Sequence, residues 1–522
     1  MKVQRAGLSA ICIWTGAVAT IGGLLGSATS MGQDVPGRVQ PVSIGNADYS
    51  RIEETLQAVI QENERLSKEV RELREQSEAV AEAQATQALA SQPEATALTP
   101  ISNDAMRWSG HGLDANEPNS GASRDPMKEY LTRYNKGFEI RPKHLAASPY
   151  SMKINLQNTF RYTSFSRDEE FWTDSAGTVR PIADVNQLAI PRGRLIFSGN
   201  AFAPDVSYLL SIDYNTVNSN PLGFRAYSLS YRFNEALQAH VGQTKVPGTR
   251  EWLNSSFDTQ QGADRSMATT FFRPSLSQGI WVTGQPREGW NYIAMLSNGF
   301  NTLNLSTSDL NNRGCGSGSL WWEPLGKYGS AYSDIENHST PVVRIGSSLT
   351  YAIEEGSQFS NFPENSAVRL SDGTLITETG ALAPDVTLQS FHLALIAFDV
   401  GWKYRGWGCS TEIYRQELTS LRGNGPIPIN TLQTYGGVAQ FGYFVVPQKL
   451  EFYSRNSFVT GAYGSGTEIG TGFNVFPMRG KTGLRFTFDT AWLDSSPADQ
   501  SRTGFAAGQS GWMFRTQLAS SF

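Results

Sequence analysis

From Tyr150 onward the chain alternates apolar and polar residues with a period of two, and no other feature of the sequence limits the fold as strongly. The pattern is clearest over residues 150–162 and returns over residues 207–214, 227–233 and 484–492. Successive side chains of a β-strand point to opposite faces of its sheet. Each segment is therefore expected to form a strand with one apolar and one polar face, which predicts an all-β domain over residues 146–522.

The same alternation fits a soluble β-sandwich, whose strands face a core and water. Two observations favour a transmembrane barrel instead. Aromatic residues stand near the ends of many apolar faces, as in the girdles of barrels at the membrane interfaces. The alternating segment that ends at Phe522 also resembles the C-terminal signature of outer-membrane barrels. We predict a 16-stranded antiparallel transmembrane β-barrel, because about fifteen strands are recognised and a barrel with both ends on one side needs an even number.

The connections between the predicted strands fall into two length classes. The long ones are expected to be outer loops or loops folded into the barrel, and they cover residues 165–186, 244–277, 301–339 and 353–386. The short ones, such as Asn234-Glu235 and Pro477-Met478, are expected to be periplasmic turns.

Residues 1–30 are predicted to be a cleavable signal peptide, because Lys2 and Arg5 precede an apolar stretch that ends in small residues. A short membrane anchor is the alternative. No later segment contains the roughly 20 consecutive apolar residues of a spanning helix, so a closed barrel is the remaining way to cross a membrane. In an exported protein Cys315 and Cys409 could form a disulfide, and two separate thiols fit equally well.

Residues 49–83 carry a heptad pattern that predicts an α-helical coiled coil. Its mainly apolar seam alternates spacings of four and three and consists of Ile52, Leu56, Val59, Asn63, Leu66, Val70, Leu73, Ser77 and Val80. A single solvated helix is the alternative, but it would not need so regular a seam. Residues 84–130 are rich in Ala, Gln, Ser, Thr and Pro, which is typical of a flexible linker.

The stretch from Pro191 to Phe300 resembles the phosphate-selective porin O and P family. The resemblance rests on Arg192–Gly199, Tyr208–Tyr214, Ala226–Tyr231, Val241–Pro247, Asp264–Ser266 and Asn298–Phe300, followed later by Gln440–Pro447 with Leu450-Glu451. It implies a homotrimer of sixteen-stranded barrels, each with its own pore, in which the third outer loop folds into the lumen. By position that loop runs from about Lys245 to Arg273. The family usually has Glu where this chain has Asp264, which keeps the charge.

Charged side chains that the alternation places in the lumen are the candidate selectivity residues. The inward loop would supply Lys245, Arg250, Arg265 and Arg273, offset by Glu251, Asp258 and Asp264, and the wall would supply Arg161, Arg194, Arg232 and Arg485. The same projection places Lys153, Arg344, Lys403, Arg405 and Arg515 in the lumen, with the acids Asp213, Asp399, Glu451 and Asp489. The planar fork of Arg suits phosphate and carboxylate oxygens. General porins also line their lumens with arginines that face acids, so a pore without anion preference stays open.

Other classes of function receive little support. None of the five histidines, His111, His144, His240, His338 and His392, lies in a recognisable catalytic motif, so we expect no enzyme, no cofactor and no metal site. The net charge of −5 gives no basic field for nucleic acid. We predict an outer-membrane porin for passive diffusion of small hydrophilic solutes, with a preference for anions and with phosphate as one candidate, and with its coiled coil in the periplasm. The alternative is a structural barrel that is tethered to the periplasm or cell wall through the coiled coil.

Overall fold

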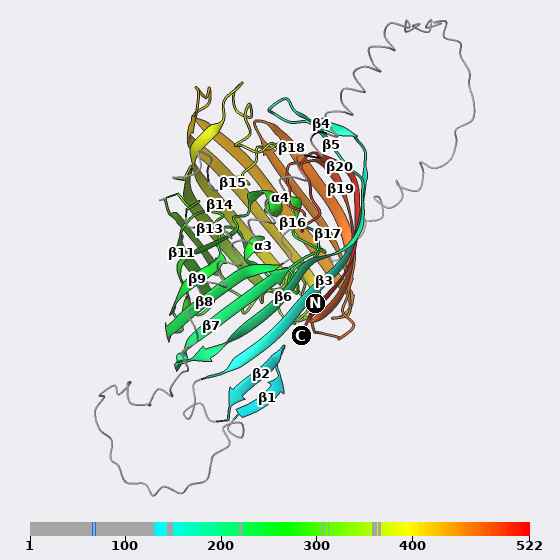
Figure 1. Cartoon of the computed structure of the whole chain (residues 1–522). Helices are drawn as coiled ribbons and strands as arrows, with labels where there is room; N and C mark the ends of the chain where they lie inside the picture. Colours follow the sequence, from blue (N-terminus) through cyan, green and yellow to red (C-terminus); the bar gives the residue numbers. More distant parts are fainter. Residues whose placement is uncertain are drawn as a thin grey trace, which may run out of the picture. The chain divides into compact units, whose positions relative to one another are not determined.

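Sixteen consecutive antiparallel strands close into a barrel in the described part of the computed structural model (Figure 1). The described residues are 130–143, 150–218, 222–303, 305–306, 308–311, 313–357, 363 and 367–522, together with Arg65 and Lys68. The barrel strands are β3 (Met152–Arg167), β6 (Val185–Ala201), β7 (Ala203–Tyr214), β8 (Leu222–Asn234), β9 (Leu237–Lys245), β10 (Leu276–Arg287), β11 (Trp290–Ser297), β12 (Cys315–Trp322), β13 (Val342–Glu355), β14 (Leu388–Tyr404), β15 (Trp407–Gly423), β16 (Thr431–Val446), β17 (Leu450–Gly461), β18 (Gly464–Val475), β19 (Leu484–Ser496) and β20 (Gln509–Ser521). The last strand pairs with the first, with Arg515 opposite Thr163, so the predicted strand number and the closure are confirmed.

The end of the barrel at which β3 begins and β20 finishes is called the proximal end here, and the opposite end is called distal. A small hairpin, β1 (Tyr130–Tyr134) and β2 (Phe138–Pro142), pairs with the start of β3 at the proximal end. A second hairpin, β4 (Phe171–Thr173) and β5 (Val179–Pro181), lies in the distal connection between β3 and β6. The links Asn234-Glu235 and Pro477-Met478 are short proximal connections, as predicted.

One predicted connection is wrong. Residues 301–339 were expected to form a single outer or inward-folded loop, but they contain β12. The segment is therefore divided into a distal connection before Cys315 and a proximal connection after Trp322. Strand β12 lacks the usual alternation because glycines, Gly316 and Gly318, occupy two of its outward positions beside Leu320. Residues 323–341, which join β12 to β13, are called the proximal insert below.

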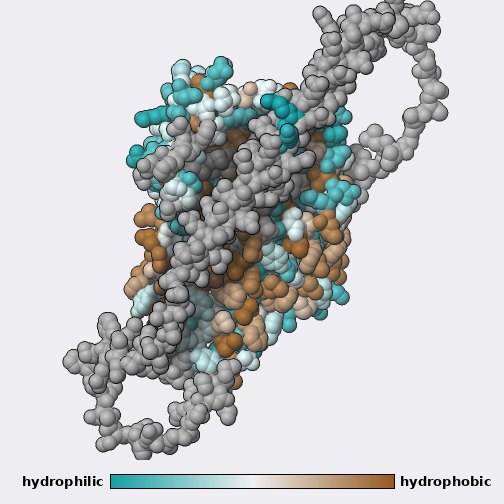
Figure 2. Space-filling model, in the orientation of Figure 1, coloured by the Kyte–Doolittle hydropathy of each residue, from teal (hydrophilic) through white to brown (hydrophobic). Residues whose placement is uncertain are grey.

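The outer face of the barrel is apolar, as a wall in lipid requires. Outward positions carry exposed large hydrophobic residues on strand after strand, for example Ile396, Ile413, Phe458 and Ile469. Figure 2 shows hydrophobic residues gathered over the lower part of the visible wall and hydrophilic residues at the distal end. Within the described residues, no helix has the length and apolar character needed to cross a bilayer.

The inner face combines buried charges with an apolar cluster. Arg515, Lys403 and Glu468 have no exposed side-chain surface although all are charged. Distal loops add apolar side chains that are buried in one cluster with the wall, among them Leu370 and Phe505. Part of the lumen is therefore filled by protein.

Three predicted segments lie wholly or largely outside the described residues: the signal peptide 1–30, the coiled coil 49–83 and the linker 84–130. Within the coiled-coil segment only Arg65 and Lys68 are described, and both are helical. Cys315 on β12 and Cys409 on β15 are free thiols, so the disulfide alternative is wrong.

Candidate pore constriction

Residues 246–275, called the inward loop, leave the distal end of β9 and return to β10 through the interior of the barrel. The loop contains two short helices, α3 (Arg250–Leu253) and α4 (Met267–Phe272). Side-chain oxygens cap both helices, because Thr249 accepts a hydrogen bond from the Trp252 amide and Ser266 accepts one from the Thr269 amide. The inward path agrees with the resemblance-based expectation for about Lys245 to Arg273.

Carboxylates of the wall hold the loop by its backbone. Glu412 of β15 accepts hydrogen bonds from the amides of Arg250 at 2.6 Å and Glu251 at 3.1 Å. Asp489 of β19 accepts from the Ala263 amide at 2.9 Å, and Glu468 of β18 accepts from the Met267 amide at 2.8 Å. A buried amide without a partner costs about 1–3 kcal/mol, so these charged acceptors make the irregular backbone tolerable inside the barrel.

Asp264 of the inward loop is the first centre of a group of basic side chains. Its carboxylate is fully buried and forms ion pairs with Arg161 of β3, at 2.6 Å, and with Arg192 of β6. Burial alone would raise the pKa of Asp264, but the two guanidinium groups hold it well below its usual range. Asp264 is therefore ionised and bridges the loop to two wall strands.

Asp213 of β7 is the second centre. It pairs with Arg194 of β6 at 2.7 Å, with Arg225 of β8 at 3.5 Å and with Arg502 of the distal connection 497–508 at 2.5 Å. One carboxylate thus faces three guanidinium groups. The Nη2 atom of Arg194 is buried and has no hydrogen-bond partner among the described residues.

The indole ring of Trp252 is the third centre. The cationic groups of Lys245, Arg265 and Arg273 lie 5.1, 4.9 and 4.6 Å from its ring centroid, within the range of cation–π attraction. Burial and repulsion from Arg265 lower the pKa of Arg273 to about 9, and burial together with repulsion from Arg192 lowers that of Arg265 to about 10. Lys245 donates to the carbonyls of Trp252, Leu253 and Asn254, which are neutral acceptors.

The three centres define the basic cluster, which contains eight cations against the two carboxylates of Asp213 and Asp264. Its members are Arg161, Arg192, Arg194, Arg225, Lys245, Arg265, Arg273 and Arg502. Glu251 lies next to Trp252 in the chain, and its carboxylate accepts hydrogen bonds from Ser266 and Gln440. Its negative charge also offsets part of the charge of Arg265. The cluster unites five of the eight site residues that the sequence predicted.

The other three predicted site residues lie elsewhere in the barrel. Arg250 pairs with Asp399 at 3.2 Å and lies outside the basic cluster. Arg485 donates to the carbonyl of Gln260, and its Nε and Nη2 atoms are buried without a partner among the described residues. Arg232 is exposed near the proximal end of β8. Arg405, which was also projected into the lumen, is instead an exposed residue of the proximal turn between β14 and β15.

Sequence reasoning missed three members of the cluster. Arg192 has the same strand parity as Arg194 and could have been found from it. Arg225 lies beside an irregularity in the pairing of β7 with β8, between Ser211 and Ile212, which changes the face that a regular strand would give it. Arg502 belongs to a distal connection, where no periodicity predicts orientation.

A cavity of about 1070 Å³ lies on the proximal side of the inward loop. It is bordered by the loop, by strands β10–β13 and by the proximal insert. Its charged lining is nearly balanced, with Arg250, Arg287, Lys327 and Arg344 against Glu288, Glu323 and Glu336. We call this cavity the proximal vestibule.

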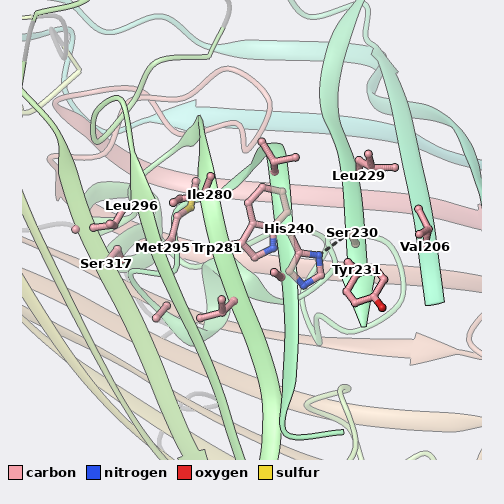
Figure 3. Close-up of a pocket in the computed structure, with 15 residues that line it drawn as sticks. Val206, Leu229, Ser230, Tyr231, His240, Ile280, Trp281, Met295, Leu296 and Ser317 are labelled. Atoms are coloured by element: carbon pink, nitrogen blue, oxygen red, sulfur yellow. Dashed lines mark hydrogen bonds between the residues drawn. The ribbon is translucent and has the colours of Figure 1, made fainter. Parts of the chain in front are cut away.

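A second hollow, of about 810 Å³, lies on the outer wall across β7–β12. Exposed Leu229, Val241 and Ile280 border it. In the same region the ring of His240 stacks on Trp281, with centroids 5.0 Å apart, and its Nδ1 atom lies 2.7 Å from the Ser230 hydroxyl (Figure 3). With Nε2 3.0 Å from the Thr283 hydroxyl as well, both ring nitrogens of His240 have a hydrogen-bond partner.

Asp334, Glu336 and His338 of the proximal insert also lie together, with candidate ligand atoms within 4.8 Å of one another. Each has a protein partner, because Asp334 contacts His338 and the Gly406 amide, and Glu336 pairs with Lys403. The described residues therefore use this group for internal contacts.

Comparison with solved structures finds barrels of low similarity. An anion-selective porin from Comamonas acidovorans has 13% identity and a TM-score of 0.42, with coverage of 71% of this chain and 100% of that one. The outer membrane channel DcaP of Acinetobacter baumannii has 12% identity and a TM-score of 0.42, with 71% and 97% coverage. OmpF of Salmonella typhi has 12% identity and a TM-score of 0.44, with 75% and 100% coverage. No family model and no curated protein matches the chain. At these values the assignment of the fold rests on the chain's own strand pairing.

Proposed function

We propose that the protein is an outer-membrane porin that admits small hydrophilic solutes by passive diffusion and prefers anions. A closed sixteen-stranded barrel with an apolar exterior suits a bilayer that must be crossed by strands. Within this reading the proximal end faces the periplasm and the distal end faces outside. The inward loop narrows the lumen, and a constriction determines which solutes pass.

The basic cluster is the observation that carries the anion preference. Eight cations surround two carboxylates, and Lys245 and Arg273 remain partly exposed to solvent. The whole barrel domain has no basic excess, with 28 Lys and Arg against 30 Asp and Glu from residue 146 onward. The excess of positive charge is therefore confined to the basic cluster, and a cation that enters this part of the lumen would meet net repulsion.

The finer parts of the proposal rest on the sequence. These parts are membership of the phosphate-selective porin O and P family, phosphate as a solute, the homotrimer, the signal peptide at 1–30 and the periplasmic coiled coil at 49–83. Guanidinium groups bind phosphate oxygens well, and Arg supplies seven of the eight cations in the cluster. The same chemistry serves carboxylates, so the cluster favours small oxyanions as a class.

Planar-bilayer recordings of the purified protein test the proposal. We expect stepwise conductance with three equal sublevels, one for each barrel of a trimer. In a KCl gradient the reversal potential should have the sign of chloride permeation. Selectivity for K⁺ would refute the anion preference, and the absence of any conductance would refute the proposal that the protein is a porin.

A structural barrel is the second candidate, because the inward loop and the apolar cluster fill part of the lumen. In that role the coiled coil would tether the barrel to the periplasm or cell wall. The two candidates differ in the same recordings, since a purely structural barrel conducts no ions.

A further inference from the structure

The proximal insert is the one long connection at the proximal end in the described barrel. Other described proximal connections are shorter, from one or two residues, as at 235–236, 288–289 and 405–406, to the eight residues 476–483. The insert runs from residue 323 to 341, and its side chains are buried at Tyr328, Tyr332 and Asp334. A polar connection that only joined two strands would remain at the surface. Its burial shows that it folds into the lumen.

The insert contacts the inward loop directly. The Tyr332 amide donates to the Thr259 carbonyl at 3.0 Å. The side chain of Asn254 donates to the Ser330 carbonyl at 3.3 Å. Two segments that enter the barrel from opposite ends therefore meet inside it.

Arg250 strengthens this meeting point. Its guanidinium carbon lies 5.0 Å from the ring centroid of Tyr328 and 4.7 Å from that of Tyr332. The same guanidinium pairs with Asp399 of the wall. One residue of the inward loop thus holds both the insert and strand β14, which explains why Arg250 lies outside the basic cluster.

The insert is also held against the wall on the β14–β18 side. Lys403 donates to the Tyr328 carbonyl at 3.0 Å, and Ser333 donates to Glu451 of β17 at 2.7 Å. Asp334 accepts from the Gly406 amide at 2.7 Å. Ala331 and Ile335 are buried with Phe444 and Phe476 in a small apolar cluster. These contacts cover the proximal opening along the strands that follow β13.

Because the insert covers the β14–β18 side of the proximal opening, the space that remains open is the proximal vestibule beside β10–β13. Its four basic and three acidic lining side chains nearly cancel, in contrast to the basic cluster. A passage with balanced charge discriminates between solutes mainly by their size. The two regions therefore differ in what they can select.

We propose that the proximal insert is a second, size-selecting constriction in series with the inward loop, and that it directs solutes through the proximal vestibule. This inference rests on the proposed function, because a size filter requires a conducting pore. In this arrangement the basic cluster determines charge preference and the insert determines the largest solute that passes.

The test compares the full-length protein with a variant in which residues 327–336 are replaced by a short Gly-Ser linker. Single-channel conductance is measured in KCl, and the size limit is measured with polyethylene glycols of increasing length. We expect conductance to rise by about twofold or more and larger polymers to enter, because pore width governs both. The reversal potential should not change, because the basic cluster is intact.

A point variant guards against misfolding of the shortened protein. Asp334→Ala removes the acceptor of the Gly406 and His338 amides and should raise the size limit in the same direction by a smaller amount. Asp309→Ala changes an exposed residue of a distal connection and serves as the matched control. Heat-modifiable migration on gels checks that each barrel is folded.

Three outcomes would overturn the inference. Equal conductance and equal size limits in wild type and both insert variants would show that the insert does not narrow the pore. A changed reversal potential with an unchanged size limit would show that the insert acts on charge. Absence of channels from wild type and variants alike would refute the proposed function itself, whereas a conducting wild type that the variants match refutes the size filter alone.

Discussion

Replacement of Asp264 by Asn tests the electrostatic account of the constriction most directly. Asp264→Asn keeps the shape of the side chain and one acceptor for the Arg265 amide, which now donates to Oδ1 at 2.8 Å. It removes the charge that faces Arg161 and Arg192. The cluster then has eight cations and one carboxylate, so anion selectivity should increase while the barrel becomes less stable.

The stability loss follows from the burial of the pair. Removal of one partner from a buried ion pair costs about 3–5 kcal/mol. Arg161 keeps hydrogen bonds to Gln517 and to the Ala263 carbonyl, which places the expected loss near the lower end of that range.

The change in selectivity follows from Coulomb's law. A monovalent anion about 8 Å from the removed carboxylate is relieved of roughly 0.5 kcal/mol of repulsion at the dielectric constant of water, and of roughly 2 kcal/mol at an effective value of about 20. The corresponding increase for the anion alone is about twofold to thirtyfold, and the equal loss of attraction for a cation increases the ratio of anion to cation permeability further. Because the lumen contains water, we expect a value near the lower limit.

Reversal potentials in a KCl gradient measure the ratio, and thermal unfolding in detergent measures the stability. Asp174→Asn is the matched control, because Asp174 is also a buried carboxylate paired with an arginine, Arg180, but it lies in the β4–β5 hairpin. The control should lose stability locally without a change in selectivity. A decrease in anion selectivity of Asp264→Asn, or an equal shift in Asp174→Asn, would refute the reasoning.

Three further predictions concern the same pore and its oligomer. Arg273→Gln should lower the anion-to-cation permeability ratio, whereas Arg415→Gln, a change on the outward face of β15, should leave the ratio unchanged in the same recordings. Phosphate should raise the thermal unfolding temperature more than nitrate at matched ionic strength, because a bound anion relieves the repulsion that, after burial, lowers the pKa values of Arg265 and Arg273. Equal temperatures would show that the cluster binds neither anion preferentially. Deletion of residues 49–83 should reduce the heat resistance of the trimer on gels, and trimers of unchanged resistance would leave the coiled coil without its proposed role.

Alternation of side chains predicted the barrel and about fifteen of its strands because that signal is repeated on nearly every strand, and the even number required of such barrels supplied the sixteenth. The strand that escaped notice, β12, has glycine where neighbouring strands have large apolar residues, and glycine provides no hydrophobic signal. The missing strand also explains why the proximal insert was assigned to one long loop. When one strand within a predicted loop is overlooked, the sequence pattern no longer shows at which end of the barrel each part of that loop lies.

Prediction of the site was limited by register and by long-range contacts. Arg161 and Arg194 follow regular parity, and the sequence placed both in the lumen. Arg225 lies at an irregular pairing, and a shift of one residue reverses the face of a strand. The interaction of Arg502 with Asp213 joins residues 289 positions apart, and no pattern in either segment predicts that contact.

The way in which the inward loop is held has a consequence for biogenesis. Its backbone is bound by carboxylates that are translated long afterwards, since Met267 and Glu468 are 201 residues apart and Ala263 and Asp489 are 226 apart. Contacts of such sequence separation form late and slowly. A nascent barrel that lacks its last strands could hold the loop only through Glu412 and through the ion pairs of Asp264 with Arg161 and Arg192, so the full set of anchors exists only after the sheet has closed. Assembly of the wall and maturation of the aperture are therefore one event, and an incompletely assembled chain would not expose a finished aperture to either compartment.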